Sequence, residues 1–361
     1  TDELVTGDEV FVDNGGVLDV DSALDVTLLS NSGQSMLDEA LDVSSYLDNS
    51  ATGRVDANAE VTARNLKNDG RWNVLSSQTL TLDGLDGDAA TGLTGEGTFC
   101  LETAGPDTNA CNGLAESDSV GATSLTLNQA GDSVFDGTFE GLGTLVKSGE
   151  GSLTLTNAQT FLGGLTVNDG VIATDVNGET SSGSFDDTLA ITVNTNGQLD
   201  VNNADTFGSL TNFGTVNVNA DQTVAFVDNK AETNADDGDG LINLRADITA
   251  TGDFKNDGRV DILGDGRTLN VATLTGAGDF DGDADGTNGD LTINQSGTST
   301  FSGDIKGVAN FVKTGAGELT LTGENAYSKF GQVKEGTLVI GAPAAMAGSN
   351  DYQVSDKATL R

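Results

Sequence analysis

Short runs in which apolar and polar residues alternate recur along most of the chain. Examples are "SLTLT" at 152, "GLTVN" at 164, "GTVNVNA" at 214 and "DLTIN" at 290. Alternation with a period of two predicts β-strands, and the Gly, Asn and Asp residues between the runs predict tight turns. In the first example the alternation places Leu153 and Leu155 inward and Thr154 outward. The pattern therefore predicts an all-β chain.

The chain also repeats itself over long distances. "SLTLNQAGDSVFDGTFEGLGTLVKSGEGSLTLT" from Ser124 matches "DLTINQSGTSTFSGDIKGVANFVKTGAGELTLT" from Asp290 without a gap, and "KNDGR" occurs at 67 and again at 255. We predict two long repeat units of one continuous solenoid, residues 1–188 and 189–345, with a third beginning at 346–361. Because this third unit stops within a motif, we expect the natural chain to continue in the same style.

The strand-like runs are short and closely spaced, so one coil has too few residues to form a hydrophobic core of its own. A coil of two or three short strands can bury its inward Leu, Val, Ile or Phe only by stacking on the next coil. A sandwich or barrel also uses short alternating strands, but it needs tight hairpins and gives no reason for a long repeat that stays in phase. The sequence therefore favours a parallel β-helix.

One segment departs from the strand pattern. "SMLDEALDVSSYLDN", residues 35–49, has apolar residues near helical spacing and no counterpart in the second repeat unit. We predict a short helix or a loop excursion here, with an irregular Leu-rich coil as the alternative.

The charge balance excludes two classes of partner. The chain has 56 acidic and 16 basic residues, so its net charge of -40 would repel nucleic-acid phosphates and anionic lipid headgroups. It also has no apolar stretch long enough to span a bilayer, so we expect no direct membrane insertion by this part of the chain. The acidic residues indicate a solvated surface in a salty environment, bound calcium, or both.

Catalytic chemistry finds little support in the composition. Histidine is absent, which removes the commonest general base and a common zinc ligand. Parallel β-helices also include polysaccharide lyases and hydrolases, but the basic residues that could pair with carboxylates recur in both repeat units, as Lys67 and Lys255 and as Arg71 and Arg259. Since a catalytic site is usually built once, we interpret "KNDGR" as a structural turn and expect no enzyme.

One loop has the first half of a calcium-binding pattern. In "DFDGDADGTNGDLTI", residues 279–293, Asp281, Asp283 and Asp285 occupy alternate positions and a glycine follows. Thr292 stands where a helix-loop-helix site needs a bidentate Glu, so the loop is not such a site. Asp290 or a backbone carbonyl could complete a looser oxygen cage. We name calcium as the candidate cofactor, with a solvated acidic turn as the alternative.

The two cysteines, Cys100 and Cys111, enclose a short loop. Its ends could meet, so we predict a disulfide, which fits an oxidising extracellular setting; the alternative is two unrelated thiols. Alignment of Phe99 with Phe280 places the cysteine loop and the aspartate loop at the same corner of the two repeat units.

Residues 313–338, "KTGAGELTLTGENAYSKFGQVKEGTL", carry a specific pattern of Gly, Leu, Asn and Tyr. It resembles the strand repeat associated with autotransporter passenger domains, and the positions that match are Lys313, Gly315, Gly317, Leu319, Leu321, Gly323, Asn325, Tyr327, Val333, Gly336 and Leu338. The first repeat unit carries a weaker version, in which Asn157, Gln159 and Phe161 stand where the pattern has Gly, Asn and Tyr.

The resemblance implies a right-handed parallel β-helix secreted to or beyond the outer surface of a Gram-negative bacterium. It further implies a non-enzymatic role in adhesion, self-association or biofilm, with other copies, surface proteins or glycans as partners. A structural extracellular fibre or matrix protein that polymerises through its repeats is the second hypothesis. A carbohydrate-active β-helix enzyme is the third.

Overall fold

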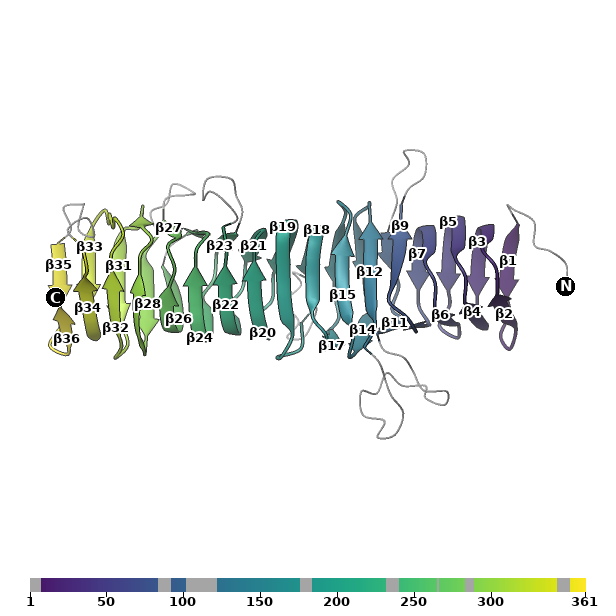
Figure 1. The fold of residues 1–361 in the computed structure, drawn as a ribbon, viewed down its shortest axis with the longest axis horizontal. Coiled ribbons are helices and arrows are strands. Elements are labelled where there is room, and N and C mark those ends of the chain that lie inside the picture. The colour runs from purple at the N-terminus through teal and green to yellow at the C-terminus, as the bar shows by residue number, and fades with distance from the viewer. Residues whose placement is uncertain are drawn as a thin grey trace, which may run out of the picture. The chain divides into compact units, whose positions relative to one another are not determined.

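The computed structural model describes residues 8–83, 92–101, 122–175, 184–231, 240–264, 266–282, 289–342 and 351–361. Within these ranges all regular structure is β-strand, and none of them contains a helix (Figure 1). The chain divides into two compact units, Thr1–Ala190 and Ile191–Arg361.

The first unit is a stack of short strands joined by tight turns. Its strands are β1 (Glu9–Val12), β2 (Val17–Val20), β3 (Leu24–Asn31), β4 (Gln34–Leu37), β5 (Leu41–Asn49), β6 (Arg54–Ala57), β7 (Val61–Asn68), β8 (Arg71–Val74), β9 (Gln78–Leu82), β10 (Gly92–Thr94), β11 (Thr98–Cys100), β12 (Ser124–Gln129), β13 (Ser133–Phe135), β14 (Thr138–Gly141), β15 (Thr144–Ser148), β16 (Ser152–Leu155), β17 (Thr160–Phe161) and β18 (Leu165–Thr174).

Strands of successive coils pair in parallel in this unit. One sheet runs in the order β17-β14-β11-β8-β6-β4-β2, and the long strands β3, β5 and β7 pair with one another on a different face of the coil. Leu41 of β5 thus lies between Leu24 of β3 and Val61 of β7. Strands of successive coils thus join the same sheet, every second strand from β2 to β8 and every third from β8 to β17, which is the arrangement of a parallel β-solenoid.

The second unit repeats this architecture. Its strands are β19 (Ala190–Val201), β20 (Asp205–Asn212), β21 (Thr215–Val218), β22 (Gln222–Asn229), β23 (Leu241–Leu244), β24 (Ile248–Asn256), β25 (Arg259–Ile262), β26 (Arg267–Thr275), β27 (Asp279–Asp281), β28 (Leu291–Gln295), β29 (Thr298–Phe301), β30 (Ile305–Lys306), β31 (Asn310–Thr314), β32 (Glu318–Leu321), β33 (Phe330–Val333), β34 (Gly336–Ile340), β35 (Asp351–Val354) and β36 (Ala358–Leu360). β20, β22, β24, β26, β28 and β31 pair in parallel in that order, and β29, β32, β34 and β36 form a separate four-stranded sheet.

The core follows the predicted alternation. Leu153 and Leu155 of β16 are fully buried, and Thr154 between them is partly exposed. Aromatic rings concentrate at a few inward positions, although they are rare in the sequence: Trp72, Phe99 and Phe139 stack through successive coils with ring centroids 5.7 and 5.1 Å apart. The all-β and parallel β-helix predictions are therefore confirmed for each unit.

Residues 35–49 are neither a helix nor an irregular coil, so the prediction for this segment was wrong. They form the end of β4 and all of β5, which pairs with β3 and β7. Leu41, Val43 and Leu47 are buried at positions that share one face of a strand, and Ser45 between them is exposed where the register shifts. The helix-like spacing arises because Leu37 ends β4 and Leu41 begins β5, so the apolar residues counted together belong to two strands joined by a turn.

The boundaries of the long sequence repeats stay a prediction. The structural units are divided by contacts within the chain, whereas the repeats at 1–188, 189–345 and 346–361 were defined by matching residues. The repeats nevertheless help to compare the two units, because equivalent sequences can be followed to their places in each fold.

Candidate functional site

The two "KNDGR" sequences form a tight corner in each unit. Residues 67–71 join β7 to β8, and residues 255–259 join β24 to β25. A Cβ atom added at Gly70 would lie 2.3 Å from the carbonyl oxygen of Gly53, and one at Gly258 would lie 2.3 Å from that of Gly240. The corner therefore requires glycine because the previous coil passes directly beneath it.

A ladder of buried asparagines links successive corners. In the second unit, Nδ2 of Asn212 donates to Oδ1 of Asn229 at 2.8 Å, and Nδ2 of Asn229 donates to Oδ1 of Asn256 at 2.8 Å. Asn229 also donates to the carbonyl oxygen of Arg259 at 3.2 Å. All three side chains are fully buried, so the ladder satisfies polar groups that the turn leaves inside the protein.

The first unit has the same ladder in Asn31, Asn49 and Asn68, with amide-to-amide distances of 2.9 and 2.7 Å. Sequence analysis did not select these residues. The recurrence of Asn two to four residues before a turn glycine, as in "SNSG" at 30 and "KNDG" at 67, was the signal that could have indicated them.

The corner lysines are held by carboxylates. Lys67 forms an ion pair with Asp69, and this hydrogen bond raises the pKa of the Lys67 ammonium. Lys255 forms the equivalent pair with Asp257, and its Nζ lies 3.8 Å from Oδ1 of Asp228. These pairs bridge turn and strand residues at equivalent places in both units, as expected for a structural turn.

Arg259, which ends the second corner, links polar groups of two successive coils. Arg259 pairs with Asp261 on its own strand and, through Nη2, with Oδ2 of Asp281 at 2.9 Å on the neighbouring strand β27. Burial raises the pKa of the Asp261 carboxyl, and the hydrogen bond from Arg259 partly opposes that rise. Arg259 thus favours the charged form of a buried carboxylate.

Replacing Arg259 with Met is expected to raise the pKa of Asp261 further, because the opposing guanidinium is lost. A carboxyl group whose pKa is raised by folding lowers the free energy of unfolding at neutral pH. This loss disappears as the pH falls through the raised pKa. The variant should therefore lose about 1 to 3 kcal/mol of unfolding free energy at pH 7 and less near pH 4, measured by urea unfolding. Arg245→Met, at an exposed arginine, is the control; a loss that does not vary with pH would contradict the assignment.

The residues predicted to bind calcium are only partly described. Asp281 pairs with Arg259, and Oδ1 of Asp290 accepts hydrogen bonds from the backbone N and from Nδ2 of Asn310 at 3.0 and 2.8 Å. Asp283 and Asp285 lie outside the described residues. Calcium binding therefore stays a prediction, and both described carboxylates already have protein partners.

The calcium hypothesis predicts a simple thermal result. Micromolar to millimolar calcium should raise the melting temperature, since a ligand that binds the folded state stabilises it, and a chelator should lower it. Asp283→Ala should abolish this difference, whereas Asp351→Ala at an exposed strand position should preserve it. Identical melting with calcium and with chelator would leave the loop as a solvated acidic turn.

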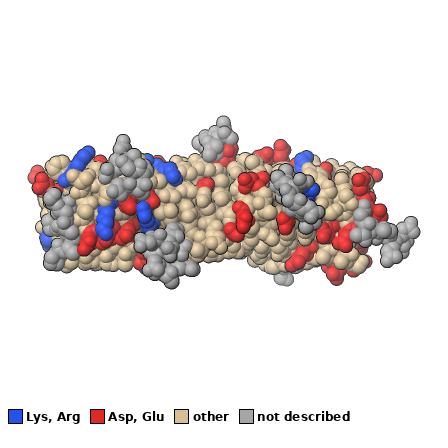
Figure 2. Space-filling view, turned by 90° about the horizontal axis from the view of Figure 1, so that it is seen from above, with Lys and Arg blue, Asp and Glu red and all other residues tan. Residues whose placement is uncertain are grey.

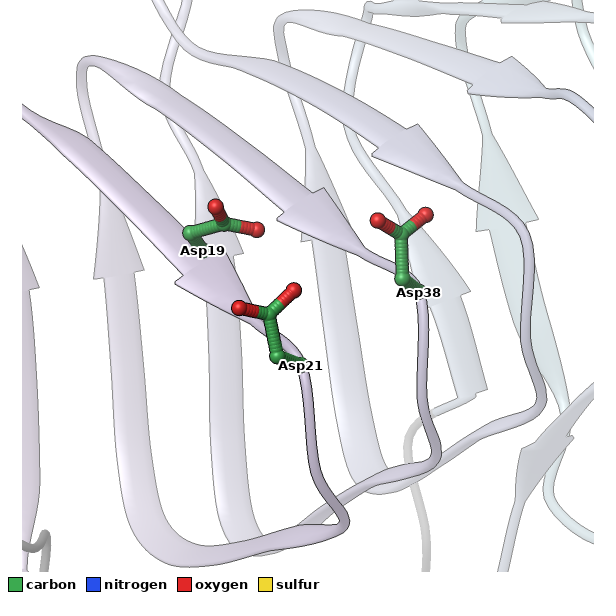
Figure 3. Close-up of side chains that lie close together, drawn as sticks. All are labelled: Asp19, Asp21 and Asp38. Carbon is green, nitrogen blue, oxygen red and sulfur yellow. The ribbon is translucent and has the colours of Figure 1, made fainter.

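Three other carboxylates converge in the first unit. Asp19 and Asp21 lie at the end of β2, and Asp38 follows β4 in the next coil (Figure 3). Each offers an oxygen within 4.8 Å of the others, and all three are exposed. Asp38 already accepts a hydrogen bond from Nδ2 of Asn58 at 2.6 Å. Sequence analysis missed this group because only coil stacking brings it together; an exposed acidic cluster does not by itself define a cation site.

Two lysines are buried at equivalent inward positions. Lys147 lies in register between Leu127 and Val167, and its Nζ donates to the carbonyl oxygens of Ser148 and Gly149 at 2.8 and 2.7 Å. Burial lowers the pKa of Lys147 to about 8, against the opposing effect of two nearby carboxylates. The Lys147 ammonium thus donates hydrogen bonds to carbonyl groups of the turn that follows it.

Lys313 has the same environment in the second unit. Its Nζ donates to the carbonyl oxygens of Thr314 and Gly315 at 2.6 and 2.9 Å, and burial lowers its pKa to about 8. Both lysines are fully buried and inaccessible to a substrate. Their equivalence supports a structural role.

The predicted disulfide cannot be followed to both of its ends. Cys100 is fully buried at the end of β11, in register with Asn73 of β8 and Glu140 of β14. Cys111 lies outside the described residues. The Cys100–Cys111 disulfide therefore stays a prediction.

A polar cleft opens over the "KNDGR" corner of the first unit. Its volume is about 460 Å³, and it is lined by Ala51, Lys67, Asp69, Thr94, Gly95, Glu96 and Asp136. Acidic side chains are also spread over much of the face shown in Figure 2, with fewer basic ones among them. Sequence analysis did not select the cleft, because its walls come from four different coils.

No segment in the described part of the chain forms a helix of the length and apolar character needed to cross a bilayer.

The fold of each unit is that of a parallel β-solenoid protein. Its inward polar side chains form hydrogen bonds with residues of the turns between coils. Two segments, residues 145–173 and 311–340, match the family described as Passenger-associated-transport-repeat, and each contains one of the buried lysines. Repeats of this kind are characteristic of autotransporter passenger β-helices and indicate a passenger domain that is secreted or surface-exposed. No curated protein and no solved structure matches the chain.

Proposed function

We propose that this chain acts at the bacterial cell surface as a non-enzymatic adhesive stretch of an autotransporter passenger, in self-association or in a biofilm matrix. The observation that carries the proposal is the presence of two passenger-associated transport repeats within stacked parallel coils. Such coils offer long, repetitive faces of polar side chains, which suit multivalent contacts with other copies, surface proteins or glycans.

The chemistry of the recurrent charged residues supports a non-catalytic role. Lys67 and Lys255 pair with carboxylates at equivalent corners, and Lys147 and Lys313 are buried against turn carbonyls. Trp72, the single tryptophan, is buried and does not present its ring to a sugar. These groups have structural partners in both units, whereas a catalytic centre is expected once.

The test is aggregation of beads or cells that carry the chain on their surface. Beads coated with the folded chain should cluster or retain bacterial cells, and beads coated with the heat-unfolded chain should stay dispersed. Ordered filaments from the purified protein without any bead clustering would favour the structural-fibre hypothesis. Release of reducing sugar from polysaccharides would contradict the non-enzymatic role.

A further inference from the structure

The cleft over the first corner has the size of a small-molecule site. Gly95 forms part of its lining with a φ of +109°, and a Cβ atom there would lie 2.3 Å from the carbonyl oxygen of Asn68. This part of the lining is therefore backbone packed closely on the previous coil. The volume of about 460 Å³ lies within the range of about 300 to 1,000 Å³ that is usual for small-molecule sites.

The second unit shows that the corner folds without two of the cleft's carboxylates. The backbone N of Glu96 donates to Oδ1 of Asp69 at 3.2 Å, and the backbone N of Ala277 donates to Oδ1 of Asp257 at 3.1 Å. The two corners therefore share this hydrogen bond, but the second has a methyl group where the first has a carboxylate.

The wall of the cleft formed by Asp136 also differs from its equivalent in the second unit. The backbone N of Asp136 donates to the carbonyl oxygen of Gly95 at 2.9 Å, and that of Ser302 donates to Gly276 at 2.8 Å. Asp136 thus has a neutral equivalent in an identical backbone position. Neither Glu96 nor Asp136 is required for the architecture.

These two carboxylates also lack a cation inside the protein. The nearby ammonium of Lys67 is held by Asp69 and also lies near Asp48. Among the residues that the structure describes, Glu96 and Asp136 form no ion pair, and Asp136 accepts only a neutral hydrogen bond, from Oγ1 of Thr156 at 2.6 Å. The cleft therefore holds negative charge in excess of its one lysine.

We propose that the cleft binds the primary ammonium group of an amino-sugar unit in a polysaccharide, with Glu96 and Asp136 as its acceptors. The lining favours a sugar over a lysine side chain or a polyamine, because Ala51 is its only apolar side chain and methylene chains need apolar surface. The hydroxyl of Thr94 and the Lys67–Asp69 pair are positioned around the same cleft to bind sugar hydroxyls. The inference rests on the proposed surface function for its choice of a glycan.

Titration calorimetry of the purified chain with a glucosamine tetramer tests this site directly. We expect saturable binding of one tetramer per chain, and about tenfold weaker binding of the N-acetylglucosamine tetramer, which lacks the positive charge. Glu96→Ala/Asp136→Ser, which copies the second unit, should weaken glucosamine binding by about tenfold without changing the melting temperature.

A matched variant separates the cleft from the general acidity of the chain. Glu60→Ala/Asp83→Ser removes the same charge from exposed positions of the same unit and should bind like the unaltered chain. Equal loss in both variants, or no binding of the glucosamine tetramer, would overturn the proposal. Tighter binding of spermine or tetralysine than of the sugar would overturn the choice of ligand. Calorimetry measures binding by the purified chain in solution, so failure of this test and failure of the bead-aggregation test can be distinguished.

Discussion

Replacing Asn229 with Ala is expected to lower the free energy of unfolding of the second unit by about 3 to 5 kcal/mol. Asn229 is the middle rung of a buried ladder: it accepts from Asn212 and donates to Asn256 and to the carbonyl oxygen of Arg259. Its removal leaves polar groups inside the protein without a partner, and each costs about 1 to 3 kcal/mol. The effect is therefore far larger than that of an ordinary surface substitution.

Urea unfolding of the variant and of Asn196→Ala measures this effect. Asn196 is an exposed asparagine of the same unit, and its replacement should change the unfolding free energy by less than about 0.5 kcal/mol. If both variants were equally stable, the ladder would not support the stacking of coils. A variant too unstable to fold would agree with the prediction, provided that Asn229→Ser, which retains a polar group, is less affected.

Replacing Lys313 with Met is expected to remove a pH dependence of stability. The pKa of Lys313 is about 8 in the folded protein, against an ordinary value of 10.5. The unfolded chain therefore holds this proton more tightly, and the penalty for burying the charge is relieved as pH rises from 8 to 10.5. Over this window the residue should contribute a gain of up to about 3 kcal/mol, which the variant lacks.

The measurement is the difference in unfolding free energy between the unaltered chain and the variant at several pH values from 7 to 10.5. The difference should shift in favour of the unaltered chain as pH rises, and it should be constant below pH 8. Lys329→Met, at an exposed lysine, is the control for general effects of charge. A constant difference across the whole range would mean that burial does not perturb Lys313.

The fold could be predicted from the sequence because its signals are local and repeated. A period of two assigns Leu153 and Leu155 to the core, and the recurrence of "KNDGR" marks equivalent turns. The failure at residues 35–49 has a local cause as well: Leu37 and Leu41 lie on two different strands, and only the turn between them gives their spacing a helical appearance. Periodicity alone cannot distinguish such a pair of strands from a helix.

The candidate sites were harder to predict because they depend on which coil lies beside which. Asp38 lies near Asp19 only because β4 stacks on β2. Asp136 and Glu96 line the same cleft only because their coils are neighbours. The number of residues in each turn determines this register, and no motif encodes it. Comparison of the two units adds this information, because it distinguishes the residues that the fold of the corner requires from those that it does not require.

Successive coils stack in parallel and in register within each unit, and a pair of introduced cysteines tests this arrangement most directly. Thr223 of β22 and Thr249 of β24 are register partners on adjacent strands, whereas Asn270 of β26 lies one strand further on. Adjacent strands lie about 4.8 Å apart, within reach of a disulfide, and two strand spacings are beyond it.

Thr223→Cys/Thr249→Cys should therefore form a disulfide under mild oxidation, mapped by mass spectrometry of tryptic peptides, since Lys230 and Arg245 lie between the two positions. Thr223→Cys/Asn270→Cys should form none. Cross-linking of the distant pair in preference to the adjacent pair would contradict the parallel stacking on which the ladders, the corners and the cleft all depend.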